Sequence, residues 1–106
     1  MNMKKIKIII VDGNITYRNN LASKLRIDGY AVEFASGGFH LLHTLEIEKD
    51  FDLVIIHENM ADMSAAEMIS LIRTTKSKDE LPVFFISNRS DELEIAKMIS
   101  DGANEY

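Results

Sequence analysis

Polar side chains stand at the ends of three apolar runs, where their chemistry would be exposed to a ligand. They are Asp12, which Gly13 follows, after residues 8–11, His57 after residues 53–56, and Ser87 after residues 83–86. A carboxylate such as Asp12 suits a hard cation like Mg²⁺, whereas the imidazole of His57 is a poor magnesium ligand and suits proton transfer. The chemistry of the site therefore depends on His57, which stands at a strand end where a second carboxylate would favour a metal ion.

Alternating short apolar runs and amphipathic segments must position these side chains. The expected strands are residues 6–11, 31–35, 51–56 and 83–86, and the expected helices are residues 14–27, 39–48, a segment opening at Ser64, and 90–100. Strict alternation of this kind predicts an α/β fold, a doubly wound parallel sheet with helices on both faces. Ligands of such sheets bind outside the carboxyl ends of the strands, where all three polar ends would meet.

Local signals mark the ends of the predicted helices. Asn14 or Thr16 can cap the first helix, and Asp28-Gly29 stops it. Ser64 with Glu67 three residues later forms a capping box. In the first predicted helix, one face contains Tyr17, Leu21 and Leu25, and the third is expected to bury Ala65, Ile69 and Ile72.

Composition limits the function classes. The 106 residues are enough for one domain, and the net charge of −5 disfavours binding to nucleic acid or to an anionic membrane. There is no cysteine, which excludes thiolate chemistry and fits a reducing, cytoplasmic location. The apolar run near the N-terminus contains Lys7 and stops at Asp12, so it is too short for a signal peptide or a membrane span.

Six sequence motifs, in order and in register, resemble the receiver domain of bacterial two-component response regulators. They are IVDGN at 10–14, GY at 29–30, ASGG at 35–38, DLVIIH at 52–57, PVFFIS at 82–87 and GANEY at 102–106. The resemblance covers the whole chain. It implies a flavodoxin-like sheet with strand order 2-1-3-4, whose fifth strand and last helix are truncated, so residues 1–106 would be one C-terminally truncated domain.

In that family a phosphoryl group passes from a kinase histidine to an aspartate at the tip of the third strand, beside a magnesium ion held by two acids. Here Asp12 matches the first acid, Gly13 stands at the second, and His57 stands at the phospho-acceptor position. Asn59 matches the residue that offers its carbonyl to the metal, while Ser87 and Tyr106 match the switch hydroxyl and aromatic residue. The family's lysine position lies just past Tyr106.

We therefore expect a pseudo-receiver, a signalling module that acts through protein contacts, is not an enzyme and has lost its magnesium cofactor. Its partner would be a histidine kinase or an output domain, not nucleic acid or membrane, and a homodimer could form through the truncated edge beside residues 83–86. Two alternatives remain open. One is a switch that responds to pH through His57 or to a small ligand at the carboxyl edge, and the other is a weak phospho-acceptor using a displaced residue such as Glu58.

For His57 itself three interpretations remain. It could be a tolerated polar residue, a partner of Asp12 that replaces the metal-bridged acids, or a phosphoryl acceptor or transition-metal ligand. His40 and His43, three residues apart on the second predicted helix, are expected to be exposed and not to bind a metal. The methionines, Met60, Met63, Met68 and Met98 among them, are expected to fill the core.

Overall fold

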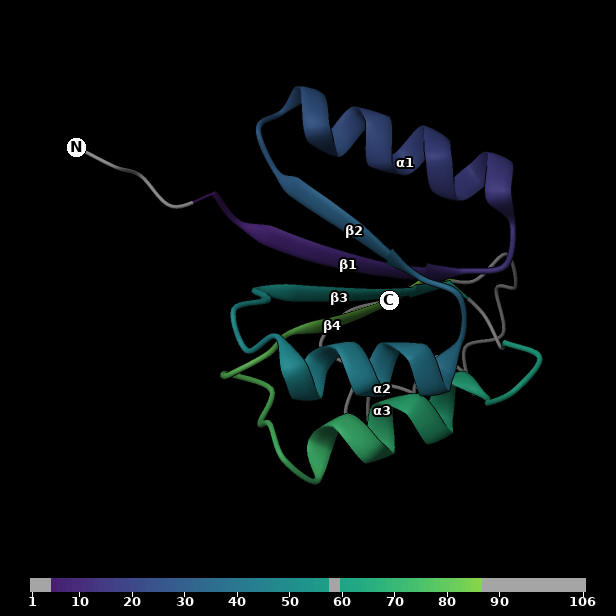
Figure 1. Cartoon of the computed structure of the whole chain (residues 1–106), viewed down its shortest axis with the longest axis vertical. Helices are drawn as coiled ribbons and strands as arrows, with labels where there is room; N and C mark the ends of the chain where they lie inside the picture. The colour runs from purple at the N-terminus through teal and green to yellow at the C-terminus, as the bar shows by residue number, and fades with distance from the viewer. Residues whose placement is uncertain (1–4, 58–59, 87–106) are drawn as a thin grey trace.

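A computed structural model of the chain describes residues 5–57 and 60–86, which form four strands and three helices in alternation. They are β1 (Lys7–Asp12), α1 (Ile15–Ile27), β2 (Ala31–Ala35), α2 (Gly38–Ile47), β3 (Leu53–His57), α3 (Ala65–Arg73) and β4 (Val83–Ile86). All strand pairs are parallel, and the sheet order is β2-β1-β3-β4. Both the doubly wound architecture and the predicted strand order are confirmed (Figure 1).

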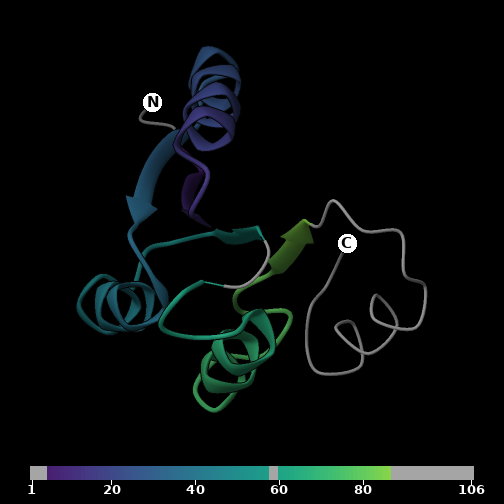
Figure 2. The same cartoon turned by 90° about the vertical axis from the view of Figure 1, so that its right-hand side faces the viewer.

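Helices cover both faces of this sheet, with α1 on one side and α2 and α3 on the other (Figures 1 and 2). Ile9 and Val11 of β1 pack into the core under α2 and α3, whereas Ile8 and Ile10 pack into the core under α1. Because successive strand residues point to opposite faces, a sheet covered on both sides needs apolar residues at every position. The unbroken apolar runs that predicted buried strands therefore have a structural cause.

The two central strands each include the polar residue at their tip. β1 ends at Asp12 and β3 ends at His57, one residue beyond the expected ends. β1 begins at Lys7 and β3 at Leu53, later than the expected Ile6 and Phe51. Ile6 is half exposed, and Phe51 is buried ahead of the strand. The strand register pairs Asp12 with His57 and His57 with Ile86. The ladder thus fixes the backbone of both polar residues side by side.

Helix ends follow the predicted capping signals. The side chain of Asn14 caps α1 by accepting a hydrogen bond from the Tyr17 N–H at 3.0 Å, and Thr16, the other candidate cap, lies inside the helix. Gly29 ends α1 with a φ of 97°, a left-handed conformation that glycine adopts readily. Ser64 Oγ accepts from the Glu67 N–H at 3.1 Å and caps α3. None of the helices in the described part of the chain is long and apolar enough to cross a membrane.

A charge cluster ties the amino edge of the sheet together. Lys7 Nζ lies 3.0 Å from Glu48 Oε2 and 3.1 Å from carboxylate oxygens of Glu33 and Asp50, and it sits over the Phe51 ring. The hydrogen bond to Glu48, followed by those to Asp50 and Glu33, raises the pKa of Lys7. The cluster joins β1 and β2 to the connection between α2 and β3.

Arginines of α1 cover the outer edge of β2. Arg26 Nη2 donates to the Val32 carbonyl at 2.9 Å, and the guanidinium groups of Arg18 and Arg26 lie 4.3 Å and 5.4 Å from the centre of the Phe34 ring. The Ala31 N–H donates to the Ile6 carbonyl, toward β1. Since backbone groups alternate in direction along a strand, the Val32 carbonyl points away from the sheet, where Arg26 meets it.

Several sequence predictions fall outside the described residues. These are the helix expected over residues 90–100, which includes Met98, and the strand expected from Ala103. β4 closes the order of the described sheet, and pairing of a second copy beside it stays a prediction. Met63 and Met68 are buried in the core, and Met60 packs against it, as expected.

Arg73 yields a test of how β4 is positioned. Its Nη1 donates to the carbonyls of Leu81 at 2.7 Å and Ser77 at 3.0 Å, and burial lowers its pKa. Arg73→Met should lower the free energy of unfolding by about 1–3 kcal/mol, because these carbonyls lose their donor. Lys24→Met, on the exposed side of α1, is the matched control and should change it by less than about 0.5 kcal/mol. Urea melts of both variants measure the difference, and equal stabilities would contradict the role of Arg73.

Candidate functional site

Asp12 and His57 meet at the carboxyl ends of β1 and β3. His57 Nδ1 lies 2.9 Å from Asp12 Oδ1, and the two residues are only 6% and 3% exposed. An ionised carboxylate can only accept, so the ring N–H at Nδ1 donates. Of the three interpretations of His57, the structure therefore contains the contact that the pairing with Asp12 requires.

The same carboxylate oxygen also holds the start of α1. The Asn14 N–H donates to Asp12 Oδ1 at 2.8 Å, while the Asn14 side chain caps the helix through the Tyr17 N–H. One oxygen thus accepts two hydrogen bonds, one from the tip of β3 and one from the loop that leads into α1. The positions of Asp12, His57 and the first turn of α1 are consequently coupled.

Tyr17 completes this arrangement by stacking on His57. The two ring centroids are 4.7 Å apart and the ring planes differ by 15°. Of the three residues expected on one face of the first helix, Leu21 and Leu25 pack into the core under α1. Tyr17 instead covers the site and is 38% exposed. The signal in the sequence was its place three residues after the cap Asn14, just beyond a strand tip that carries an acid.

Two buried polar atoms of the pair have no hydrogen-bond partner within residues 5–57 and 60–86. They are Asp12 Oδ2 and His57 Nε2. The Nδ1 bond to a carboxylate is the arrangement that orients a histidine for chemistry at Nε2. At this site, however, Nε2 is buried and the ring face lies against Tyr17, so the geometry closes the histidine off from solvent.

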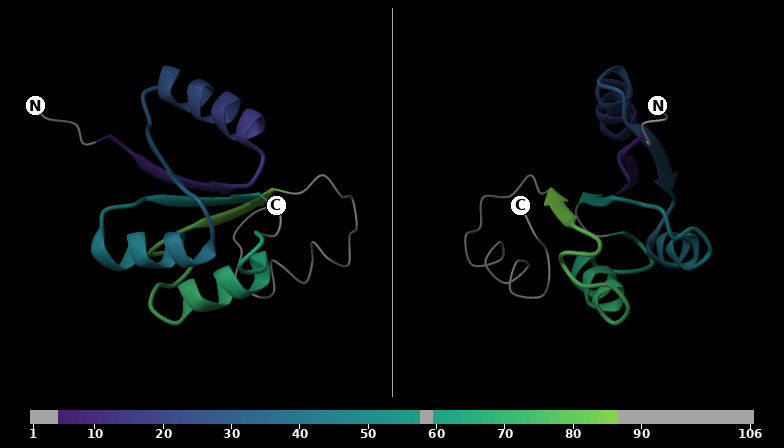
Figure 3. Two further views of the ribbon diagram at one scale, coloured as in Figure 1. Left: turned by 45° about the vertical axis from the view of Figure 1, so that its right-hand side comes forward. Right: turned by 90° about the vertical axis from the view of Figure 1, so that its left-hand side faces the viewer.

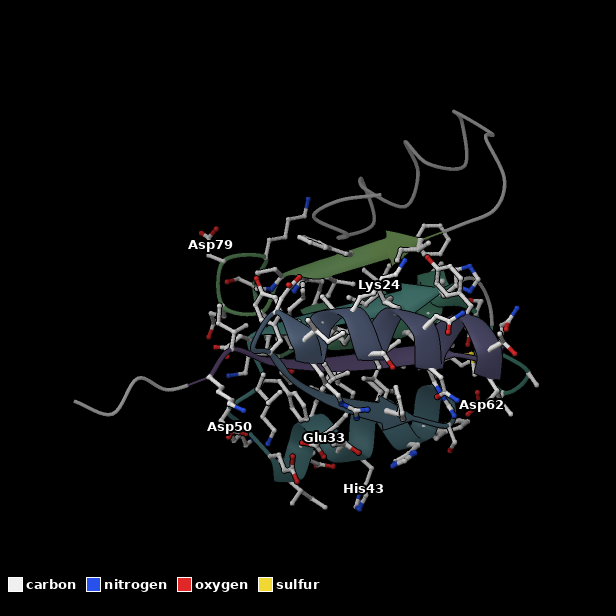
Figure 4. The ribbon with its side chains drawn as sticks, turned by 90° about the horizontal axis from the view of Figure 1, so that it is seen from above. Lys24, Glu33, His43, Asp50, Asp62 and Asp79 are labelled. Carbon is white, nitrogen blue, oxygen red and sulfur yellow. The ribbon has the colours of Figure 1, made fainter. Side chains whose placement is uncertain are left out.

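Asp62, in the loop after β3, connects this edge to α2. Its carboxylate accepts from the Gly38 N–H at 3.0 Å and the Phe39 N–H at 3.1 Å, which lowers its pKa. Gly37, the residue at the start of α2, makes no side-chain cap of its own. A Cβ atom on Gly38 would lie 2.7 Å from the Met63 Cβ, so this approach of loop and helix requires glycine. Figure 4 shows Asp62 at the end of the molecule opposite Asp50 and Asp79.

The described residues do not fit a magnesium ion. Mg²⁺ requires near-octahedral oxygen ligands, usually including more than one carboxylate or phosphate. Asp12 Oδ1 is already engaged by two hydrogen bonds, Gly13 has no side chain, and His57 presents nitrogen. No group of three potential metal ligands occurs within the described ranges.

Some of the remaining predicted site residues lie outside the described part of the chain, and the others are exposed within it. Glu58, Asn59, Ser87 and Tyr106 lie outside the described residues, so their roles stay predictions. Gly13 is exposed, and a Cβ added to it would meet only the Met60 Cε, at 3.9 Å. His40 and His43 are exposed on α2, and His40 Nδ1 accepts from the Ser36 N–H at 2.9 Å.

Comparison with known proteins gives a family match over almost the whole chain. The model of the family described as the response regulator receiver domain matches residues 8–106. The transcriptional regulatory protein ZraR of Klebsiella oxytoca is 30% identical over 106 residues, which are 100% of this chain and 23% of that protein. The chemotaxis protein CheY homolog of Campylobacter jejuni is 24% identical over 95% of this chain and 78% of that protein.

Solved structures agree with this match. The chain resembles a putative two-component system response regulator/GGDEF domain protein, with a TM-score of 0.88 and 27% identity over 95% of this chain and 41% of that one. It also resembles the chemotaxis response regulator CheY4 of Vibrio cholerae, with a TM-score of 0.87 and 24% identity over 96% of this chain and 84% of that one. The chain spans less than half the length of the first three curated relatives, at 23%, 42% and 8%.

The Tyr17–His57 stack is tested by two variants of one position. Tyr17→Leu should lower the free energy of unfolding by about 0.5–1.5 kcal/mol, the range typical of an aromatic pair. It should also shift the ring-proton NMR signals of His57 downfield, because the ring current of Tyr17 is lost. Tyr17→Phe keeps the ring and should change neither quantity much. Unchanged His57 signals in Tyr17→Leu would show that the rings do not stack in solution.

The Asp62 cap predicts a dependence of stability on pH. Because the folded-state pKa of Asp62 is lowered, its contribution is complete above the ordinary value of 3.8 and is lost as pH falls through the folded-state pKa. The difference in unfolding free energy between the wild type and Asp62→Asn should therefore be full at pH 6 and narrow in acid. Denaturant melts from pH 7 to about pH 2.5 measure it. A difference that stays constant with pH would argue against the cap.

Proposed function

Because the chain belongs to the response regulator receiver domain family, we propose that it is a signalling module that works through protein contacts and without aspartyl phosphorylation. The observation that carries this proposal is the buried hydrogen bond of 2.9 Å between His57 and Asp12. These two residues occupy the positions at which a phosphorylated receiver would need an acceptor carboxylate and an acid that binds a cation.

The residue at the phospho-acceptor position, His57, is the first support for the proposal. His57 is the tip of β3, paired in register with the tip of β1, and this is the position that the family resemblance assigns to the phosphorylated aspartate. A histidine there cannot form an acyl phosphate. Its remaining nitrogen, Nε2, is buried beside Tyr17, which hinders attack on a phosphoryl donor. On the same ground we propose that the chain is not an enzyme.

The second support comes from Asp12, the acid that would help to bind a cation in a phosphorylated receiver. Phosphoryl transfer relies on positive charge that neutralises the transferred oxygens. The hydrogen bonds from His57 and Asn14 both go to Asp12 Oδ1, so this oxygen is engaged without a metal. Hydrogen bonds of this type to a charged group contribute about 1.5–3 kcal/mol to stability, and a metal at Oδ1 would have to displace them.

A receiver held in one arrangement still offers a surface for partners. The relatives that match are longer proteins, among them a transcriptional regulatory protein and a sensor protein. We propose that this module contacts a histidine kinase or an output domain in the same way that a receiver does, with its site fixed instead of switched. Nothing in the chain's net charge of −5 favours nucleic acid as the contact.

The second candidate is a module that responds to a small ligand at the carboxyl edge of the sheet. Asp12 Oδ2 and His57 Nε2, which have no partner in the part of the chain that the structure describes, favour it, because buried polar atoms without partners are costly and a ligand could satisfy them. A response to pH through His57, and phosphorylation at Glu58, stay predictions.

Incubation with acetyl phosphate or beryllofluoride and magnesium tests the proposal. The wild type should show no mass adduct, and no amide signals around Asp12 and His57 should shift when magnesium is added up to about 10 mM, since the oxygen ligands are lacking. The double variant Gly13→Asp with His57→Asp restores the two acids, and the space around Gly13 accepts a side chain. It should bind magnesium, with shifts centred on Asp12.

The single variant His57→Asn serves as the control, because it removes the imidazole without adding a carboxylate. It should not gain magnesium binding. A stoichiometric phosphoryl adduct on the wild-type chain would contradict the proposal, whether it formed at His57 or elsewhere.

A further inference from the structure

A groove opens at the amino edge of the sheet, at the end of the molecule opposite Asp12 and His57. It lies between the C-terminal ends of α2 and α3 and has a volume of about 470 Å³. Figure 3 shows these two helices side by side under the same face of the sheet. Its apolar lining consists of Leu42, Leu45, Phe51, Leu71, Ile72 and Leu81. This volume is in the range of ligand pockets, roughly 300–1,000 Å³.

Apolar side chains remain exposed at this end of the two helices. Leu71 lines the groove and is 44% exposed, and Ile47, the last residue of α2, is 65% exposed. Phe51, Ile72 and Leu81 form the buried floor below them. An apolar cavity whose rim also exposes large apolar side chains is typical of a contact with another molecule.

The charged residues at the rim of the groove indicate which kind of molecule would bind there. The last turn of α2 contains no basic residue and carries Glu46 instead, although the partial negative charge of a helix C-terminus favours a cation. By contrast, the last turn of α3 has Arg73, which donates to the carbonyls of the following loop. The last turn of α2 therefore lacks the basic side chain that the last turn of α3 has, although Lys49 follows two residues after α2.

The other charged groups facing the groove come from its two connecting loops. They are Glu48 and Lys49 after α2, and Lys76 and Glu80 after α3. Glu48 is bound by Lys7, and Glu80 accepts a hydrogen bond from the Ser77 N–H and interacts with Lys76. Since Lys7 balances Glu48 and Lys76 interacts with Glu80, the remaining charged groups at the rim are Glu46, in the last turn of α2, and Lys49.

We propose that the groove between α2 and α3 is a docking site for a protein segment that inserts a large apolar side chain and places a neighbouring lysine or arginine at the C-terminus of α2. The apolar floor accepts the side chain, and Glu46, in the last turn of α2 where the helix dipole favours a cation, accepts the positive charge. The acidic net charge of the whole chain favours the same basic partner. Because the groove lies at the far edge of the sheet, this docking does not depend on the state of the Asp12–His57 pair.

Methyl NMR with two peptides tests the proposal on the full chain. One capped tetrapeptide has two leucines flanked by lysines, and the other has the same leucines flanked by glutamates. The lysine peptide should shift the methyl signals of Leu42, Leu45 and Leu71 in a saturable way. The glutamate peptide should bind at least about tenfold more weakly. Equal binding of the two peptides, or shifts spread over the surface without saturation, would overturn the proposal.

A matched pair of tryptophan substitutions locates the binding. Thr75→Trp places a bulky ring at the groove and should weaken binding of the lysine peptide at least about tenfold, whereas Ser23→Trp on exposed α1 should not change it. If Thr75→Trp does not fold, Leu71→Ser at the half-exposed rim should give the same loss. Unchanged affinity in the folded variants would overturn the proposal. So would leucinamide binding as tightly as the tetrapeptide, since the occupant would then be a small molecule.

Discussion

The rest of the carboxyl edge depends on one hydrogen bond, from His57 Nδ1 to Asp12 Oδ1. It joins the two central strands at their tips, and the same oxygen fixes Asn14, whose side chain starts α1. The first turn of α1 then brings Tyr17 back over His57. Four residues on three elements form a closed circuit of contacts. A change at any one of them shifts the other three, so the edge has one favoured arrangement.

The two ends of the sheet differ accordingly in what they can do. At the carboxyl edge, Asp12 and His57 are buried and joined by one hydrogen bond, and the ring of Tyr17 covers His57. At the amino edge, Lys7 gathers three carboxylates on one side, and the groove between α2 and α3 leaves apolar side chains exposed on the other. Such folds commonly bind their ligands at the carboxyl ends of the strands, whereas the groove among the described residues lies at the opposite end.

The strands and the Asp12–His57 contact could both be predicted from the sequence, because both follow from the arrangement of the parallel sheet. Unbroken apolar runs require a sheet covered on both faces, and the strand order makes the first and third strands neighbours, so their polar tips must meet. The Tyr17 stack was missed because helical periodicity places a residue on a face and does not say what lies beyond the end of the sheet. The Asp62 cap was missed because it joins residues 24 positions apart, a contact that depends on how closely the loop approaches Gly38. The groove was missed because two helix ends that are distant in sequence form it.

The Arg26 bond to the Val32 carbonyl has a consequence for how this sheet could grow. An open strand edge invites another chain to add itself through main-chain hydrogen bonds, and repeated addition leads to fibrils. At β2 the guanidinium occupies an outward acceptor, and the two arginines over Phe34 place positive charge where an incoming backbone would lie. An approaching strand would have to displace a hydrogen-bonded cation before forming its first rung. The helix that supplies Tyr17 to the site at one end thus also protects the β2 edge of the sheet.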